Sequence, residues 1–102
     1  MERLDESADG REIELAEGQE FELTLDENPT TGFRWRLTAG GSAACSLVGD
    51  EFRAPDKARP GQGGSHVWQF RAVRAGECRI ALSYARAAGD AARDFQMRVR
   101  VT

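Results

Sequence analysis

The chain has 102 residues, a length typical of a single domain with one hydrophobic core. Its 14 Lys and Arg residues stand against 17 Asp and Glu residues, a formal net charge of −3, and this acidic balance argues against a nucleic-acid partner. No apolar run approaches the roughly 20 residues that a membrane span requires, so we expect no membrane partner either.

The first ten residues are polar and acidic, and we expect them to be a flexible N-terminal segment. Residues 11–102 are expected to form the folded domain. The start of the chain lacks the apolar segment of a signal peptide. We therefore expect either a cytoplasmic protein or one whose export signal is not part of this sequence.

Apolar residues alternate with polar ones along most of the chain, which is the pattern of β-strands with one buried face. About seven such strands without an amphipathic helix predict an all-β fold, an immunoglobulin-like antiparallel β-sandwich. The alternating apolar positions, in chain order, are Ile13 and Leu15; Phe21, Leu23 and Leu25; Phe33, Trp35 and Leu37; Cys45, Leu47 and Phe52; His66, Trp68, Phe70 and Ala72; Cys78, Ile80, Leu82 and Tyr84; Phe95, Met97, Val99 and Val101.

The aromatic residues at these positions predict the core, and the alternate polar residues predict the solvent-facing surface. We expect Phe21, Trp35, Trp68, Phe70 and Phe95 to fill the space between the two sheets. The residues expected to face water include Arg34, Gln69, Arg79 and Arg98.

Three long loops are predicted, at residues 26–32, 54–65 and 86–93, and long loops in a small domain are commonly functional. In the first loop, Pro29 restricts the backbone and Gly32 can adopt a positive φ, which makes the loop stiff. Two threonines stand at its apex. We interpret this loop as a contact surface for a partner, although an ordinary hairpin turn has a similar composition.

Two cysteines, Cys45 and Cys78, lie in alternating apolar segments, where small buried thiols are common. We therefore favour two free buried cysteines. A single disulfide between them is the alternative, since the sequence gives no distance between the two residues.

Catalytic and cofactor sites have little support in the sequence. The single histidine, His66, shares a face with Trp68 and Phe70, and we interpret it as a structural histidine rather than a general base. One histidine and two separated cysteines do not make a zinc pattern. The run Gly61-Gln62-Gly63-Gly64 lacks the Lys-Ser/Thr and the helix of a phosphate-binding loop. We expect no enzyme activity, no metal and no cofactor.

Four motifs follow one another along the chain: Asn28-Pro29-Thr30-Thr31-Gly32-Phe33; Gly61-Gln62-Gly63-Gly64 before Val67-Trp68-Gln69-Phe70; Ala75-Gly76; and Tyr84-Ala85-Arg86. Together they resemble the chagasin-type inhibitors of papain-like cysteine proteases, from about residue 11 to the C-terminus. The resemblance implies a small immunoglobulin-like sandwich that presents three loops at one end. It also implies a reversible inhibitor, which we expect to be a monomer.

In the mechanism that the resemblance implies, the 28–33 loop enters the active-site cleft of the protease, flanked by the 61–64 and 86–93 loops. Thr30 and Thr31 would lie nearest the catalytic cysteine. The implied protease-binding residues are Asn28, Pro29, Thr30, Thr31, Gly32, Phe33, Gly61, Gly63, Gly64 and Arg86.

The third loop departs from the family's usual Arg-Pro followed by a large aromatic residue, because Arg86 is followed here by Ala87 and Ala88. Large aromatic anchors often carry much of the binding energy of an interface. We therefore expect weaker or narrower inhibition than a complete set of loops would give. The alternative function is a non-inhibitory protein- or peptide-binding module that uses the same loop end.

Overall fold

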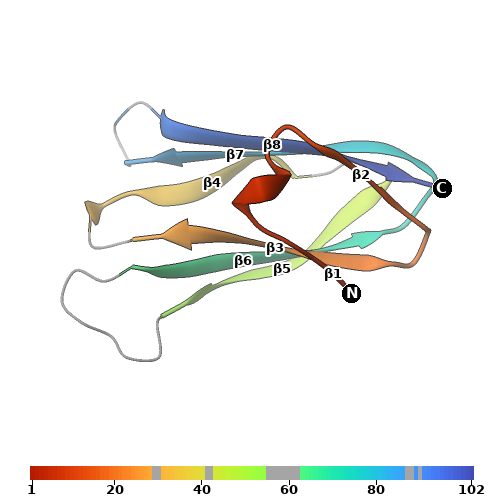
Figure 1. Ribbon diagram of the computed structural model, residues 1–102, viewed down its shortest axis with the longest axis horizontal. Helices are drawn as coiled ribbons and strands as arrows, with labels where there is room; N and C mark the ends of the chain where they lie inside the picture. The colour runs from red at the N-terminus through yellow and green to blue at the C-terminus, as the bar shows by residue number, and fades with distance from the viewer. Residues whose placement is uncertain (29–30, 41–42, 55–62, 87–88, 90) are drawn as a thin grey trace.

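The computed structural model describes residues 1–28, 31–40, 43–54, 63–86, 89 and 91–102. Two four-stranded sheets pack face to face in a sandwich, which confirms the predicted fold class (Figure 1). The first sheet has the order β1 (Glu2–Leu4), β3 (Glu20–Glu27), β6 (Gly64–Ala72) and β5 (Cys45–Arg53). The second has the order β2 (Glu12–Leu15), β8 (Ala91–Val101), β7 (Gly76–Ala85) and β4 (Arg34–Gly40).

The N-terminal segment contributes to both sheets. β1 pairs with β3 and β2 pairs with β8, and both pairs are parallel, whereas the remaining pairs are antiparallel as predicted. Between β1 and β2 the chain crosses from one sheet to the other through a 3-10 helix, η1 (Glu6–Ala8) (Figure 1). Within the segment that we expected to be flexible, residues 2–4 pair with β3 and residues 6–8 form the 3-10 helix. Leu4 and Ala8 pack against the core, and the acidic side chains face solvent.

The alternating pattern places the predicted aromatic residues inside. Phe21, Trp35, Trp68, Phe70 and Phe95 are all buried between the sheets. Phe21 and Phe70 are partners in the register of β3 and β6, and their rings stack with centroids 5.0 Å apart. Burial of each large apolar side chain stabilises the fold by about 1.5–3 kcal/mol. The predicted outward residues follow the pattern, with Arg34, Arg79 and Arg98 exposed and Gln69 half-buried.

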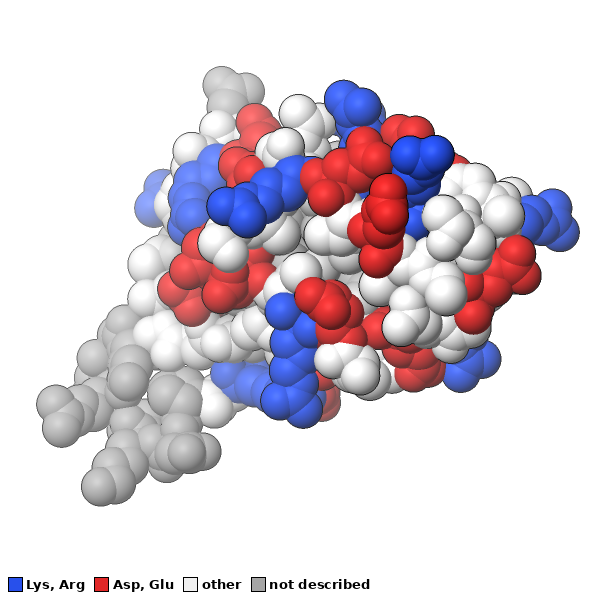
Figure 2. Space-filling view, turned by 45° about the vertical axis from the view of Figure 1, so that its right-hand side comes forward, with Lys and Arg blue, Asp and Glu red and all other residues white. Residues whose placement is uncertain are grey.

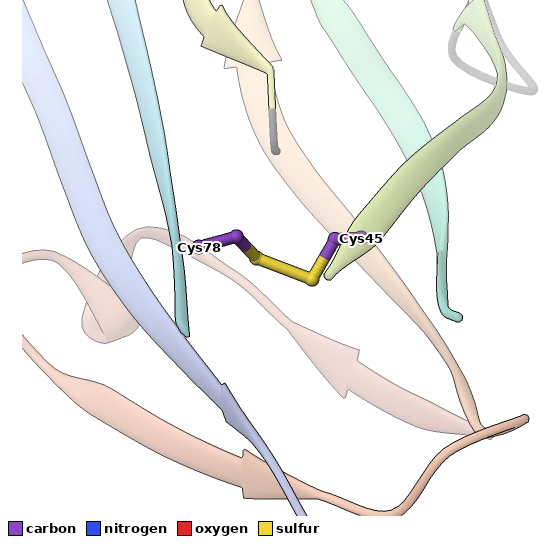
Figure 3. Close-up of a disulfide and its surroundings, with 2 residues drawn as sticks. All are labelled: Cys45 and Cys78. Carbon is purple, nitrogen blue, oxygen red and sulfur yellow. A yellow bond between two sulfur atoms is a disulfide. The ribbon is translucent and has the colours of Figure 1, made fainter. Parts of the chain in front are cut away.

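Cys45 and Cys78 form a disulfide, so our preference for free thiols is wrong (Figure 3). Cys45 begins β5 in the first sheet, and Cys78 lies near the start of β7 in the second. Both side chains point into the interior, where the two Cα atoms are 6.3 Å apart. The bridge thus joins the two sheets across the core. Which inward positions face each other across the sheets depends on tertiary packing, which the alternation does not contain.

Three connections leave the sandwich at the same end, where β3, β5 and β7 end and β4, β6 and β8 begin (Figure 1). We call this the loop end, and the opposite end, which holds Cys45 and Cys78, the disulfide end. The loops have fewer residues than predicted. Pairing of β3 with β6 continues to Glu27 and Gly64, and β8 begins at Ala91.

Candidate functional site

The loop end brings parts of all three predicted loops into contact. A Cβ atom added to Gly63 would lie only 3.1 Å from Cβ of Asn28 and 3.2 Å from the carbonyl oxygen of Glu27. A Cβ atom added to Gly32 would lie 3.9 Å from Cγ of Arg86. The first loop therefore lies between the second and the third. Of the predicted site residues, Pro29, Thr30 and Gly61 lie outside the described residues.

The first loop is a tight turn closed on the carbonyl of Asn28. The backbone N–H of Thr31 donates to this oxygen at 3.2 Å, and the Thr31 hydroxyl donates to it at 2.7 Å. The N–H of Phe33 in turn lies 3.5 Å from the Thr31 hydroxyl oxygen. Gly32 has φ +83°, as the sequence predicts. Thr31 is thus exposed at the surface while its hydroxyl holds the turn together.

Aromatic rings support this turn from below. Tyr84 of β7 stacks on Phe33, with centroids 5.4 Å apart, and lies against its register partner Trp35 at 4.9 Å. Its hydroxyl oxygen accepts a hydrogen bond of 3.0 Å from the backbone N–H of Asn28. The sequence indicated Tyr84 as a core position but not this contact with the loop.

Arg86 turns toward the first loop. Its guanidinium lies 4.7 Å from the centroid of the Phe33 ring, a cation–π contact of about 0.5–1 kcal/mol at an exposed site. Arg86 thereby joins the third loop to the first. Ala87 and Ala88 lie outside the described residues, so the expected effect of the missing aromatic residue stays a prediction.

Gly63 and Gly64 have packing requirements of their own. An added Cβ at Gly64 would collide with the carbonyl oxygen of Arg53 and would lie 2.8 Å from Cζ of Phe52. Glycine is thus needed at Gly64 to let β6 begin next to β5, and at Gly63 it allows a close approach to the first loop. Their place at the loop end therefore has a structural reason besides any contact with a partner.

The sequence pattern did not predict the role of one charged residue at the loop end. Glu27 is 2% exposed and points between the sheets, where its Oε2 accepts a 2.7 Å hydrogen bond from the backbone N–H of Trp35. Its Oε1 lies 3.1 Å from Nδ1 of His66, and Nε2 of His66 lies 2.7 Å from Oδ2 of Asp50. The imidazole also stacks on Trp68. A signal existed, since Glu27 occupies the next inward position after Phe21, Leu23 and Leu25.

The described residues give no support for a metal site or a membrane segment. Among them, no group of three or more His, Cys, Asp and Glu side chains is arranged to hold a metal ion. The same part of the chain contains no helix that is long and apolar enough to cross a membrane. Figure 2 shows acidic and basic side chains interspersed over one face of the molecule.

A two-sheet sandwich with a closed turn held between two further loops is typical of a class of protein that contacts its partner through loops carried on a rigid scaffold. Comparison with known families places the chain within this class. Residues 14–101 match the chagasin family peptidase inhibitor I42, and the chain belongs to this family of inhibitors, which are not enzymes.

Individual relatives agree with this assignment. Chagasin of Trypanosoma cruzi is 27% identical over 88 residues, which are 82% of this chain and 80% of that protein. The solution structure of Amebosin superposes with a TM-score of 0.80 at 28% identity, covering 100% of this chain and 99% of that one. The cysteine protease inhibitor EhICP2 of Entamoeba histolytica, at 20% identity, shares the fold with a TM-score of 0.85, covering 99% of this chain and 95% of that one.

Proposed function

We propose that this protein is a reversible inhibitor of papain-like cysteine proteases and that the 28–33 loop enters the active-site cleft. The second and third loops would contact the two sides of the cleft, through Gly61–Gly64 and Arg86. The observation that carries the proposal is the position of the first loop, which lies against Gly63 on one side and Arg86 on the other. Three loops in this order would present an edge suited to a groove.

The closed turn also accounts for resistance to cleavage. A protease must bring the scissile carbonyl and its nucleophile into an attack geometry, which requires the substrate backbone to adapt to the cleft. Here the turn is fixed by two hydrogen bonds from Thr31 to the Asn28 carbonyl and by the Tyr84 contact to the Asn28 N–H. With Asn28 and Thr31 fixed in this way, the turn would resist the change of shape that hydrolysis needs.

The same rigidity favours affinity. Ordering a loop on binding costs conformational entropy, and a loop that is already ordered loses less of it. Phe33 and Arg86 contribute by packing against each other beneath and beside the turn. The 28–33 loop would therefore bind in the conformation that it has in the free protein, rather than become ordered on its target.

The test is an inhibition assay against papain with a small peptide substrate, followed by mass spectrometry of the recovered inhibitor. We expect tight inhibition that is reversed on dilution, with the inhibitor chain uncut after prolonged incubation. Absence of inhibition, or recovery of a chain that is cut between residues 28 and 33, would contradict the proposal. Lack of inhibition together with binding to some other protein would instead support the non-inhibitory module.

A further inference from the structure

The buried carboxylate of Glu27 joins parts of the molecule that flank two different loops. Its Oε2 accepts from the N–H of Trp35, just after the first loop, while its Oε1 contacts His66, just after the second. Glu27 itself immediately precedes the first loop. One carboxylate therefore links both ends of the 28–33 loop to the start of β6.

Asp50 extends this arrangement to the edge strand. Its Oδ2 lies 2.7 Å from Nε2 of His66, so the imidazole bridges a carboxylate on β3 and a carboxylate on β5. β5 leads into the second loop and β6 leaves it. We name Glu27, His66 and Asp50 the carboxylate–histidine clamp.

The two contacts of His66 fix the number of protons that the clamp needs. A neutral imidazole donates from one nitrogen and has a lone pair on the other, whereas the protonated ring donates from both. Ionised carboxylates only accept. Both contacts of His66 can be hydrogen bonds at the same time only when the clamp holds one additional proton.

The surroundings of the ring show which contact breaks when that proton leaves. The titratable groups that face the imidazole are Glu27 from β3 and Asp50 from β5; the register neighbours Leu25 and Phe52 and the stacked Trp68 are apolar. The Glu27 side chain is 1% exposed and that of Asp50 is 48% exposed. A neutral His66 therefore keeps its bond to the buried Glu27, and Asp50 turns to solvent.

We propose that the carboxylate–histidine clamp is a protonation-dependent positioning device that ties β5 to β6 and so sets the position of the second loop beside the first. This inference rests on the proposed function, because that position affects inhibition only if both loops contact one protease. Histidine changes its charge between about pH 5 and 8. Inhibition should be strongest with the clamp protonated and should weaken as pH rises through this range.

The experiment compares the wild type with Asp50→Asn, His66→Gln and, as a matched control, Glu51→Gln. Glu51 neighbours Asp50 on β5 but is exposed and pairs with Arg53, so its change removes the same charge without touching the clamp. The dissociation constant for papain is measured at pH 5, 6, 7 and 8. The dissociation constant of each variant is divided by that of the wild type at the same pH, so that the effect of pH on the protease itself cancels.

We expect the wild type to bind about tenfold more tightly than Asp50→Asn or His66→Gln at pH 5, because one charged hydrogen bond is involved. At pH 8 the Asp50→Asn ratio should approach one, and the His66→Gln ratio should fall less far, since that variant also lacks the imidazole that contacts Glu27. The Glu51→Gln ratio should stay near one throughout. A ratio that does not vary with pH in the clamp variants would overturn the inference, even if they bind less tightly.

A second measurement uses the free inhibitor. Nitrogen-15 NMR of His66 should show protons on both ring nitrogens at pH 5 and loss of the proton that faces Asp50 at pH 8. Ring nitrogen signals that do not change between pH 5 and pH 8 would refute the clamp. A wild type that fails to bind papain at every pH would overturn the proposed function and the positioning role with it, while the nitrogen-15 spectrum would still decide whether the clamp binds the proton.

Discussion

The two ends of the sandwich are held together by different kinds of interaction. At the disulfide end, a covalent bridge joins β5 to β7, and the stacked pair of Phe21 and Phe70 lies in the adjoining core. At the loop end, inward positions are occupied by polar groups, with Glu27 bonded to Trp35 and Tyr84 bonded to Asn28. Apolar packing has little directional preference, whereas hydrogen bonds have a defined geometry. The interactions at the disulfide end thus mainly hold the two sheets together, and those at the loop end mainly fix the orientation of the loops. Changes at the disulfide end should therefore alter stability more than inhibition, and changes at the loop end should alter inhibition more than stability.

The largest effect on inhibition is expected from Thr31→Arg. Thr31 is exposed at the turn that would enter the cleft, and a long charged side chain there cannot be accommodated in a narrow groove. We expect affinity for papain to fall about a thousandfold or more, within the range of interface hot spots. Thr31→Ser is the control, since it retains the hydroxyl that closes the turn, and should inhibit nearly as well. Undiminished inhibition by the arginine variant would remove the first loop from the mechanism.

Removal of the disulfide should have the largest effect on stability. The bridge closes a segment with a sequence separation of 33, and its loss in the double variant Cys45→Ala, Cys78→Ala should lower the free energy of unfolding by about 3–4 kcal/mol. Urea denaturation measures this change. Affinity for papain should stay within about twofold wherever the variant is folded, because the bridge is distant from the loops. A parallel loss of affinity would mean that the two ends are coupled.

A smaller effect on binding is expected from Tyr84→Phe. The change keeps the ring stacked on Phe33 but removes the hydroxyl oxygen that accepts from the Asn28 N–H. Loss of this hydrogen bond beneath the turn should cost about 1–2 kcal/mol, seen as roughly tenfold weaker inhibition with faster dissociation. Stopped-flow displacement measures the dissociation rate. An unchanged rate would show that Tyr84 supports the turn only through its ring.

The smallest effect is expected at the outer surface near the disulfide end. The side chain of Arg71 donates a 3.0 Å hydrogen bond to Glu20, and this bond lowers the pKa of the Glu20 carboxyl below its ordinary value of 4.5. A lowered pKa in the folded state contributes stability above the ordinary pKa, and this contribution disappears as pH falls through the lowered value. Arg71→Gln should therefore reduce the free energy of unfolding slightly at pH 6 and not at pH 2. An equal difference at both pH values would contradict this assignment, and inhibition should not change.

The sequence predicts most of the architecture because strand alternation is a local property. The inward positions of Phe21, Trp68 and Phe95 follow from spacing alone, and so does the fold class. β1 was missed because three residues are too few to show a period, and its pairing with β3 is a contact between distant segments. The same limit explains the wrong preference at Cys45 and Cys78, which meet only through the packing of one sheet on the other.

The candidate site was predictable in part. The motif around Asn28 indicated a turn in which Gly32 adopts a positive φ, and its φ of +83° confirms that expectation. The role of Glu27 was not found, because its partners lie 39 residues away at His66 and 8 residues away at Trp35. Alternation shows that an acidic residue points inward but not which groups compensate its burial.

The placement of β3 and β4 in different sheets has a consequence for an inhibitor that suffers a single cut in its first loop. β3 is bonded along its length to β6, and β4 is bonded to β7, so neither new terminus would diffuse away. The hydrogen bond between Glu27 and Trp35 would keep the two severed ends close together. Religation would then compete with release of the products, because ends held in place react as if at very high concentration. A nicked molecule of this kind would remain assembled and could be restored by the protease that cut it.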